Sequence, residues 1–499
     1  MLREMSVQLF SVEDYFLADY PRTLFPLTTT SLLVEKFSAE IKDFLYNGLL
    51  CKTSTSSGFP VQQRCYSAKR GYALRRTVKL DPVAEFFVYD VVFRNRRFFR
   101  SDHRPTRKSF GYRFSSGRPE SASDAYTSYR KALAEARSMY PLTLKADVAS
   151  YFNSIYHHDL VTTVREIGWA DSDCEALGQF LRESNAGRSV DCLPHGIHPC
   201  KVLGSEFLRF LDNSYKLRSS LGIRFLDDLH FFDSSETTLL SDLVTLQELL
   251  GERGLSLNDS KGEFGPITDI DLPKRIDEMK RDLLKIRRKI LVVSGETVEL
   301  EAPVQVPLGL EQVDYLFHLL GTPEIEESDA ELVLVLLRDH AETVFPKMQN
   351  VLAKFPGLTK NLYHYARLAS DSTGLDDLVE NFLKDSPNAT EYQLFWFAKI
   401  AEDFLSKSPK LGEILTKLFE HPKSTILTRA KVLEIPDRRF GLPERREEVL
   451  RSARSDWEAW AAAAGVRCQT SASRNHLLTY FGKGSPLNSL VAECIRRLP

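Results

Sequence analysis

Hydrophobic and polar residues follow several different patterns along the first half of the chain, and together they predict both helices and strands. Residues 121–139 start with Ser and Asp and continue in helix-forming residues, which predicts a helix. Residues 29–50 also predict a helix, with a loop after it at 52–61. Residues 140–152 (YPLTLKADVASYF) predict a strand that ends in a turn, and residues 222–233 (GIRFLDDLHFFD) predict a β-hairpin with two acidic residues at its tip.

Three other segments are harder to assign or mark a change of pattern. The apolar positions of residues 70–100 fit buried helices and buried strands equally well, because periodicity does not separate the two. Residues 273–293 predict a helix with Pro in its first turn, whose apolar stripe favours packing on its own core over a short coiled coil. Residues 294–309 contain two prolines and two glycines and predict a linker.

From residue 310 to the end, the pattern is that of successive helices of roughly 10–18 residues, separated by Pro, Gly, Ser or Asn. Helices that stack in loose pairs as a solenoid would fit this pattern. We therefore expect an α+β protein with one domain over residues 1–293, a linker at 294–309 and an all-α helical-repeat domain over 310–499.

Composition excludes several classes of protein. The chain has 499 residues, of which 43% are hydrophobic and 27% charged, so it has enough apolar residues for two to four folded domains. The longest apolar run, residues 331–337, is much shorter than the roughly 20 residues of a membrane-spanning helix, and the N-terminus does not resemble a signal peptide. Seven cysteines without a CxxC pair indicate reduced thiols. We expect a cytoplasmic protein that does not contact a membrane.

The net charge of −2 hides an uneven distribution. The 55 residues from Arg64 to Arg118 contain fifteen Lys or Arg and four Asp or Glu, a net charge of +11, and aromatic residues lie among them. Such a segment is typical of a protein that binds a polyanion, although a solvated surface without a partner would give the same count. Residues 301–499, by contrast, carry a net charge of −4.

Three carboxylates are the strongest candidates for chemistry. Asp147 ends a predicted apolar strand, and Asp227 and Asp228 lie at the tip of the predicted hairpin. Carboxylates between apolar segments are costly unless something neutralises them, and a divalent cation does so. Two Mg²⁺ ions held by such acids would stabilise the attacking and leaving oxygens of a phosphoryl transfer, and Mn²⁺ could replace them.

Five segments resemble, in order and spacing, conserved motifs of reverse transcriptases. They are the fingers segment SFGYRFSSGRPESASDAYTSYRKAL, motif A LKADVASYFNSIYHHDL, motif B LPHGIHPCKVLGSEFLRFLD, motif C FLDD and motif D LSLNDSKGEF. The resemblance covers about residues 70–265 and implies a palm and fingers fold with DNA polymerase activity.

The resemblance also implies roles for residues that match these motifs. Asp147 and Asp227 would bind both metal ions, Asp228 would assist, and Val148 would offer its backbone carbonyl to a metal. Lys261 would protonate the leaving pyrophosphate.

Further positions would bind the nucleotide. Phe152 matches the steric gate that excludes a ribose 2′-OH, which implies that the enzyme uses dNTPs. The fingers arginines would clamp the triphosphate, and motif B would contact the incoming base; the residues concerned are Arg75, Arg76, Arg113, His195 and Gly196.

The sequence departs from templated enzymes at several places. His195 replaces the usual Gln of motif B, and a slightly acidic helical region replaces a basic thumb. The four residues Cys192, His195, His198 and Cys200 could also form a zinc site, but their spacing is unusual and motif B accounts for the segment.

These traits resemble the abortive-infection reverse transcriptases of bacteria and their prophages, which carry HEAT-like helices in place of a thumb. The resemblance implies DNA synthesis from dNTPs without a template, priming from a tyrosine that stays covalently attached to the single-stranded product, assembly as a homo-oligomer, and phage resistance. Which of the 18 tyrosines is the primer stays open. The alternatives are RNA-templated cDNA synthesis, as in retrons, and a non-catalytic helical-repeat interaction protein.

Overall fold

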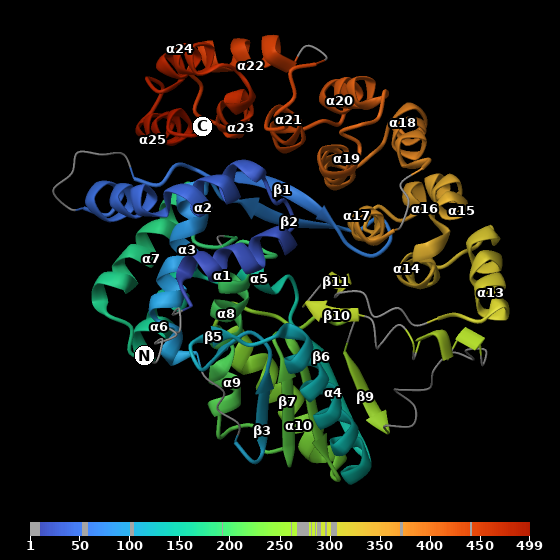
Figure 1. The fold of residues 1–499 in the computed structure, drawn as a ribbon. Coiled ribbons are helices and arrows are strands. Elements are labelled where there is room, and N and C mark those ends of the chain that lie inside the picture. The colour runs from blue at the N-terminus through green and yellow to red at the C-terminus, as the bar shows by residue number, and fades with distance from the viewer. Residues whose placement is uncertain are drawn as a thin grey trace, which may run out of the picture.

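The computed structural model of the chain combines a mixed β-sheet with many helices, so the predicted α+β class is confirmed (Figure 1). No helix in the described residues is long and apolar enough to cross a membrane. The structure describes residues 10–51, 58–99, 104–191, 193–260, 262–266, 279–280, 282–284, 286, 291–294, 297–300, 307–369, 373–439 and 442–499.

The central sheet has five strands in the order β3-β7-β8-β6-β9. They are β3 (Arg107–Phe110), β6 (Leu142–Asp147), β7 (Leu221–Phe225), β8 (Asp228–Asp233) and β9 (Glu263–Pro266). β3 runs parallel to β7, and the other pairs are antiparallel. The strand predicted at 140–152 and the hairpin predicted at 222–233 are therefore confirmed as β6 and as β7–β8.

The α-helices described before residue 252 surround the sheet and build the rest of this part. They are α1 (Val12–Asp19), α2 (Thr28–Asp43), α3 (Pro82–Arg94), α4 (Ala122–Met139), α5 (Tyr151–Ser154), α6 (His157–Glu166), α7 (Asp171–Ser184), α8 (His198–Phe207), α9 (Arg209–Asn213) and α10 (Glu236–Gly251). α4 packs on β3 and β7, whereas α10 packs on β6 and β8. The helices predicted at 121–139 and 29–50 are confirmed, the second continuing from α2 into a π-helical turn at Phe44–Leu49.

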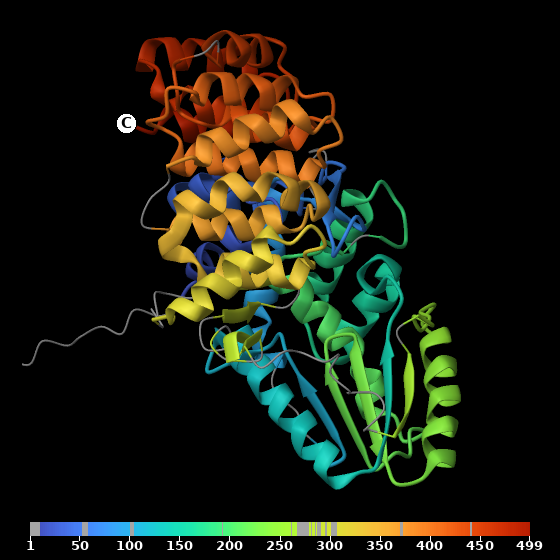
Figure 2. The same cartoon turned by 90° about the vertical axis from the view of Figure 1, so that its right-hand side faces the viewer.

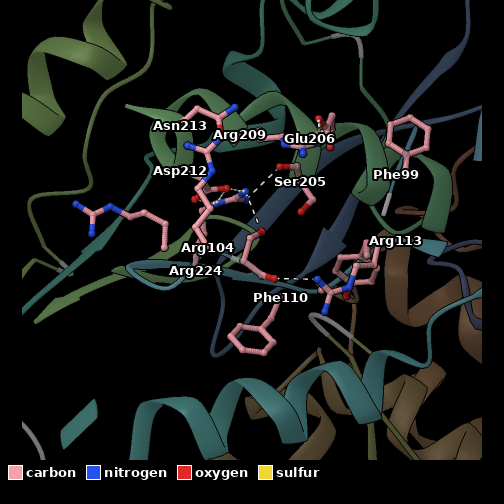
Figure 3. A pocket seen from close by; sticks show the side chains of 14 residues that line it. Phe99, Arg104, Phe110, Arg113, Ser205, Glu206, Arg209, Asp212, Asn213 and Arg224 are labelled. Atoms are coloured by element: carbon pink, nitrogen blue, oxygen red, sulfur yellow. Dashed lines mark hydrogen bonds and ion pairs between the residues drawn. The ribbon is translucent and has the colours of Figure 1, made fainter. Parts of the chain in front are cut away.

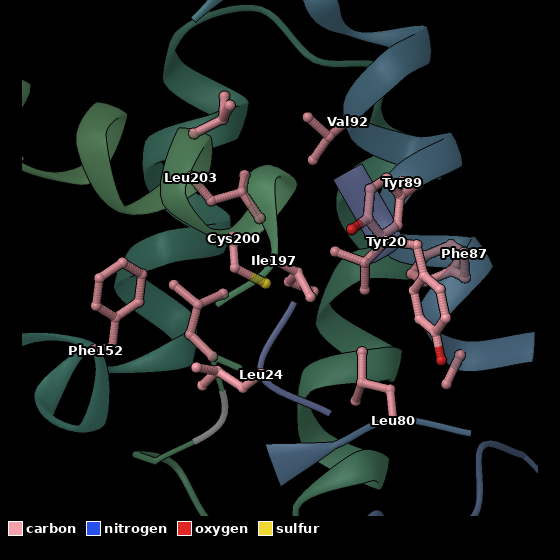
Figure 4. Packing of buried hydrophobic residues seen from close by; sticks show 14 of the residues in the cluster. Tyr20, Leu24, Leu80, Phe87, Tyr89, Val92, Phe152, Ile197, Cys200 and Leu203 are labelled. Carbon is pink, nitrogen blue, oxygen red and sulfur yellow. The ribbon is translucent and has the colours of Figure 1, made fainter. Parts of the chain in front are cut away.

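The ambiguous segment 70–100 resolves into a strand followed by a buried helix. α3 is buried along Pro82–Phe93, and Figure 4 shows its Phe87, Tyr89 and Val92 among the apolar side chains of the core. Asp81 caps its start by accepting the backbone N–H groups of Val83 and Ala84. A helix buried on every side has no polar face, so its hydrophobic pattern does not distinguish it from a buried strand.

The hairpin of β1 (Gln63–Ala68) and β2 (Leu74–Lys79) was not predicted. Its strands pair antiparallel, with Ser67 opposite Arg75 and Tyr66 opposite Arg76. One face, including Cys65 and Thr77, is buried, while Tyr66, Leu74 and Arg76 on the other face are exposed. Polar residues lie on both faces, so the sequence does not alternate clearly between apolar and polar.

The end of the helix predicted over 273–293 is wrong. Leu291–Ser294 forms strand β10, which pairs with β11 (Thr297–Leu300), so the helix does not include residues 291–293. The strand β11 lies within the segment predicted as a linker, and the linker itself stays a prediction. The β-branched residues Val292, Val293 and Val298 favour this pairing. The described residues 279–280, 282–284 and 286 are helical, as predicted.

The helices predicted from residue 310 onward are confirmed and form what we call the helical array (Figure 2). It comprises α13 (Leu310–Gly321), α14 (Glu327–Leu336), α15 (Ala341–Val344), α16 (Met348–Lys354), α17 (Leu358–Leu368), α18 (Leu375–Asp385), α19 (Glu391–Phe404), α20 (Leu411–Glu420), α21 (Ile426–Leu433), α22 (Leu442–Arg451), α23 (Trp457–Gly465), α24 (Ser471–Phe481) and α25 (Pro486–Arg496). Contacts run along α14, α17, α19, α21, α23 and α25 in one layer, and along α16, α18 and α20, then α22 and α24, in a second. Their assignment as HEAT-like repeats stays a prediction.

The array has a buried apolar cluster of its own, but its first layer also shares the core of the helices around the sheet. Tyr392, Phe395 and Trp396 of α19 and apolar residues of α21 and α23 belong to the same buried cluster as the helices around the sheet. The first layer of the array therefore packs directly on α2 and β1.

One carboxylate of the array caps a helix from the other end of the chain. Leu27 stands at the N-cap of α2 and has no polar side chain to offer. Glu434 accepts the backbone N–H groups of Thr28 and Thr29, at 2.8 and 2.7 Å, and the hydroxyl of Thr29. Glu434 is fully buried, and the equally buried Lys431 balances its charge at 2.5 Å. The array thus supplies both the cap and a neutralised charge at this interface.

We predict that Glu434→Gln lowers the free energy of unfolding by about 3 kcal/mol, because it leaves the Lys431 ammonium buried with less compensation. Urea unfolding followed by circular dichroism measures the change. The matched control is Glu413→Gln, which removes an exposed partner of Lys417 and should cost less than about 1 kcal/mol. Equal losses in the two variants would contradict the prediction.

Candidate active site

The register of the sheet brings together three carboxylates from distant parts of the sequence. Asp147 is the last residue of β6 and lies directly opposite Asp228, the first residue of β8. Residues opposite each other in an antiparallel pair have their Cα atoms about 4.5–5.5 Å apart. Asp227 lies in the turn before β8, and all three residues line one cavity of about 970 Å³, here called the carboxylate cavity.

Strained turns hold these carboxylates. Leu226, which precedes Asp227, is buried and has a φ of 55°, in the left-handed region that favours glycine. Ser150, three residues after Asp147, has a φ of 47°. Such conformations cost on the order of 1–3 kcal/mol each, so the surrounding structure must enforce them.

Arg224 of β7 supports the turn, and Figure 3 shows its side chain beside Ser205 and Asp212. Its Nη1 donates to the carbonyl of Leu226 and to that of Ser205, each at 3.1 Å, and its Nη2 donates to Ser109 Oγ at 3.0 Å. Its Nε and Nη2 also donate to both carboxylate oxygens of Asp212. This buried guanidinium therefore fixes the strained turn to β3, α8 and α9.

The segment after α10 orients Asp147. Asn258 Nδ2 donates to Asp147 Oδ2 at 3.1 Å, and the backbone N–H of Asn258 donates to the carbonyl of Asp147 at 2.8 Å. Ala149 N–H donates to the carbonyl of Ser256, and these two backbone bonds leave the carbonyl of Val148 outside the bridge between Val148 and Leu257. Asn258 was not predicted; its place in the LSLND segment, close to Lys261, was the available signal.

Cations line the part of the carboxylate cavity that is built by the β1–β2 hairpin and α8. They are Lys69, Arg70, Arg75, Arg76 and Lys201. Burial lowers the pKa of Arg75, and the nearby charge of Asp227 opposes that shift. Arg76 Nε pairs with Asp191 Oδ2 at 3.0 Å, and the Lys201 ammonium lies 4.9 Å from the ring centre of Tyr112. The cavity therefore combines carboxylates and cations, an arrangement suited to a ligand that carries phosphates and metal ions.

Phe152 and His195 pack against each other beside the carboxylates. Their ring centres are 4.7 Å apart, and Phe152 is only 3% exposed (labelled in Figure 4). A Cβ on Gly204 would lie 3.1 Å from the Phe152 ring, so close packing fixes the ring from a second side. Burial lowers the pKa of His195 to about 3, helped by Arg75, so its imidazole is neutral near pH 7. Gly196 also lines the cavity.

Two predicted residues do not join this group in the described structure. Arg113 does not line the carboxylate cavity; its Nη1 donates to the carbonyl of Ser109 at 2.9 Å and its Nε donates to Glu120. Lys261 lies outside the described residues.

The alternative zinc site receives no support. His198 Nδ1 bonds to the hydroxyl of Tyr15 at 2.6 Å, and Cys200 is buried in the apolar core (Figure 4). Cys192 lies outside the described residues.

The donor set fits Mg²⁺ better than zinc. Within the described residues, no three His, Cys, Asp or Glu side chains are grouped closely enough to hold one ion by themselves. Mg²⁺ does not require such a cage, because it is usually bound by one or two carboxylates together with water and substrate phosphates. Asp147, Asp227, Asp228 and the carbonyl of Val148 are all oxygen donors at one cavity. They fit a pair of ions that the phosphates of a substrate would complete.

Comparisons with known proteins give little more. No known protein family and no curated protein matches the chain. Among solved structures, apo telomerase from Candida tropicalis is similar, with 11% identity, 81% of this chain and 72% of that chain covered, and a TM-score of 0.32. Telomerases in complex with a TWJ fragment of telomeric RNA are also similar. The complex from Candida albicans has 11% identity and a TM-score of 0.26, with 74% of this chain and 64% of that chain covered. The complex from Candida tropicalis has 12% identity and a TM-score of 0.29, with 78% of this chain and 64% of that chain covered. Likeness at this level establishes neither a family nor an activity.

We predict that Arg224→Met lowers the free energy of unfolding by about 3 kcal/mol or more, because Asp212 would lose its buried partner and the turn at Leu226 would lose a donor. Thermal and urea unfolding measure the loss. The exposed Arg130 of α4 provides the matched control, Arg130→Gln, which should change stability by less than about 0.5 kcal/mol. A fully stable Arg224→Met variant would show that the turn does not depend on this ion pair.

Buried neutral histidines predict a loss of stability at acidic pH. Burial lowers the pKa of His230, on β8, to about 3, whereas an unfolded histidine titrates near 6.5. Because the unfolded chain takes up the proton first, the stability from this group is complete above about pH 6.5 and falls as the pH drops toward 3. His230→Phe should therefore reduce the difference in unfolding free energy between pH 7 and pH 5 by about 2 kcal/mol. Replacing the exposed His318 by Gln should leave that difference unchanged.

Proposed function

We propose that the protein is a DNA polymerase of the reverse-transcriptase type, which joins dNTPs to a hydroxyl by a two-metal nucleotidyl transfer. The observation that carries this proposal is the convergence of Asp147, Asp227 and Asp228 in one cavity that cations also line. The resemblance of the surrounding segments to motifs A to D supports the same reaction.

The residues of the cavity suit the parts of that reaction. Arg75 and Arg76 hold the triphosphate through guanidinium–phosphate contacts, and Phe152 lies under the sugar, where its fixed ring excludes a 2′-OH. Asp147 and Asp227 would hold the ions, with Asp147 oriented by Asn258. A pair of Mg²⁺ or Mn²⁺ ions would supply the positive charge that favours ionisation of the attacking hydroxyl and balances the departing pyrophosphate. Lys261 is the proposed proton donor to that leaving group.

We further propose that synthesis needs no template and starts from a tyrosine hydroxyl of the protein, so that the single-stranded product stays covalently attached. Duplex binding requires cations opposite the phosphates, but residues 301–499 carry a net charge of −4. The array also contacts the β1–β2 hairpin through carboxylates, since Glu391 accepts the N–H of Tyr66 and Glu327 that of Gly71. Both observations disfavour a thumb that grips primer and template.

In the cell, this activity would serve abortive-infection defence against phage in the bacterial cytoplasm, carried out by a homo-oligomer. These roles rest on the resemblance to abortive-infection reverse transcriptases. RNA-templated synthesis is the alternative. Strong stimulation by poly(rA)–oligo(dT), with a product that copies the template, would favour it. A non-catalytic role would be favoured if variants of the three carboxylates kept phage resistance.

The direct test incubates the purified protein with labelled dNTPs and Mg²⁺, without nucleic acid, and follows the label on a denaturing gel. We expect label on the polypeptide, and we expect Asp227→Asn to reduce it by more than about a hundredfold, because the metal ions would lose a carboxylate. Asp314→Asn, an exposed change on α13, is the matched control and should label normally. Normal labelling of a folded Asp227→Asn variant would refute the proposed site.

A further inference from the structure

The basic segment from Arg64 to Arg118 supplies cations to two separate cavities. Those of the β1–β2 hairpin line the carboxylate cavity. A second cavity, of about 940 Å³, lies where the end of α3 meets the short hairpin of β4 (Phe114–Ser115) and β5 (Arg118–Pro119). It is here called the arginine cavity, and among the described residues its lining shares none with the carboxylate cavity.

Four arginines line the arginine cavity: Arg94, Arg96, Arg97 and Arg113. Arg94 and Arg113 have carboxylate partners, because Arg94 pairs with Asp90 and Asp173 and Arg113 with Glu120. In the described part of the chain, neither Arg96 nor Arg97 has a carboxylate within ion-pair distance. The cavity therefore keeps a positive charge that its own acidic side chains do not balance.

Aromatic rings hold the guanidinium groups of Arg96 and Arg97 in place. The Arg96 guanidinium lies 4.0 Å from the ring centre of Phe93, and that of Arg97 lies 4.6 Å from the ring centre of Phe98. Arg96 Nη1 also donates to the carbonyl of Phe93 at 2.8 Å. Stacking of this kind engages the flat face of the guanidinium and leaves edge N–H groups for an anion, and an arginine that is already oriented loses less entropy when it binds.

The turn of the β4–β5 hairpin forms another wall of the arginine cavity. Ser115, Ser116 and Gly117 line it, and a Cβ on Gly117 would come within 3.6 Å of Arg96 Nε. Serine hydroxyls beside arginines are further donors for phosphate oxygens. Phe110 and Phe114 also line the cavity but are buried, so they offer no open ring on which a base could stack.

We propose that the arginine cavity binds the phosphate backbone of a single-stranded nucleic acid, without preference for sequence. Several fixed arginines with hydroxyl donors match successive phosphates. A cavity of about 940 Å³ is too small to enclose a duplex, which is wide and stiff, whereas a flexible single strand can bend into it. The inference goes beyond the proposed synthesis, because it concerns a second site that holds a strand away from the three carboxylates.

The test measures binding of fluorescent oligo(dT) by anisotropy at several salt concentrations, with the full chain and without dNTPs. Arg96→Gln combined with Arg97→Gln should weaken binding at least about tenfold at low salt. It should also reduce the slope of log K against log salt by about 1.4, since each lost contact to a single strand contributes about 0.7. Arg96→Lys with Arg97→Lys should keep most of the slope, with intermediate affinity, because it retains the charge but loses the fork and the stacking.

Two controls separate this site from a general effect of charge and from the proposed synthesis. Lys407→Gln with Lys423→Gln removes the same charge from exposed positions of the array and should change neither the affinity nor the slope. The second control is the nucleotide-labelling assay, run on the unmodified protein and on the double glutamine variant. If nucleotide labelling fails while binding still depends on Arg96 and Arg97, the proposed synthesis is wrong and the arginine cavity stands.

Three results would overturn the proposal. The first is unchanged affinity of the double glutamine variant for oligo(dT), with a melting temperature that matches that of the unmodified protein. The second is an equal loss of affinity in the array control, which would assign the effect to overall charge. An acidic peptide that competes more strongly than oligo(dT) for the same arginines would instead identify a protein partner.

Discussion

The candidate site depends on one constraint, which is the electrostatic cost of bringing three carboxylates together at one end of a sheet. The β6–β8 register places Asp147 opposite Asp228, and the strained turn at Leu226 places Asp227 beside them. Like charges at this separation repel one another, and the burial of Asp147 adds a desolvation cost. The hydrogen bond from Asn258 to Asp147 and the cations elsewhere in the cavity offset part of this cost. A polyanion and divalent cations that bind together would complete that compensation, and a nucleoside triphosphate with its metals is such a ligand.

The position of the cations depends in turn on the helical array. Glu391 and Glu327 of the array bind the backbone of the β1–β2 hairpin at Tyr66 and Gly71, and the hydroxyl of Tyr72 donates to the carbonyl of Ala353 at 3.0 Å. A two-stranded hairpin alone is barely stable in water, so these contacts help to fix the strand that carries Arg75 and Arg76. The buried pair of Glu434 and Lys431 fastens the same array to α2. The array therefore contributes to the geometry of the site, although none of the array residues that the structure describes lines the carboxylate cavity.

Local signals were enough to predict the elements that carry the carboxylates. An apolar strand that ends in Asp147 and an apolar hairpin with two acids at its tip are encoded within about a dozen residues each. The supports of the site were not predictable in the same way. Asn258 contacts Asp147, which lies 111 positions earlier in the sequence. Arg224 is held in place by hydrogen bonds to Ser109 and Asp212, which are distant in sequence or on another element. The β1–β2 hairpin shows no clear alternation of apolar and polar residues. In the segment 291–293, β-branched residues outweighed a helical stripe that extended from the preceding residues.

The basic segment shows most clearly why a charge count along the sequence is not a map of a surface. Its net charge of +11 counts all these residues together, yet α3 interrupts the segment with 13 residues that are almost wholly buried. A helix of that length spans about 20 Å, so the cations before it and those after it lie at opposite ends of a rigid rod. Those before it, on β2, face the carboxylates, while Arg94, Arg96 and Arg97 at its far end line the arginine cavity. One stretch of sequence thus supplies cations to two cavities that differ in their balance of charge. In the first, the cations compensate the carboxylates of the proposed active site, whereas in the second a positive charge without that balance favours a polyanion by itself.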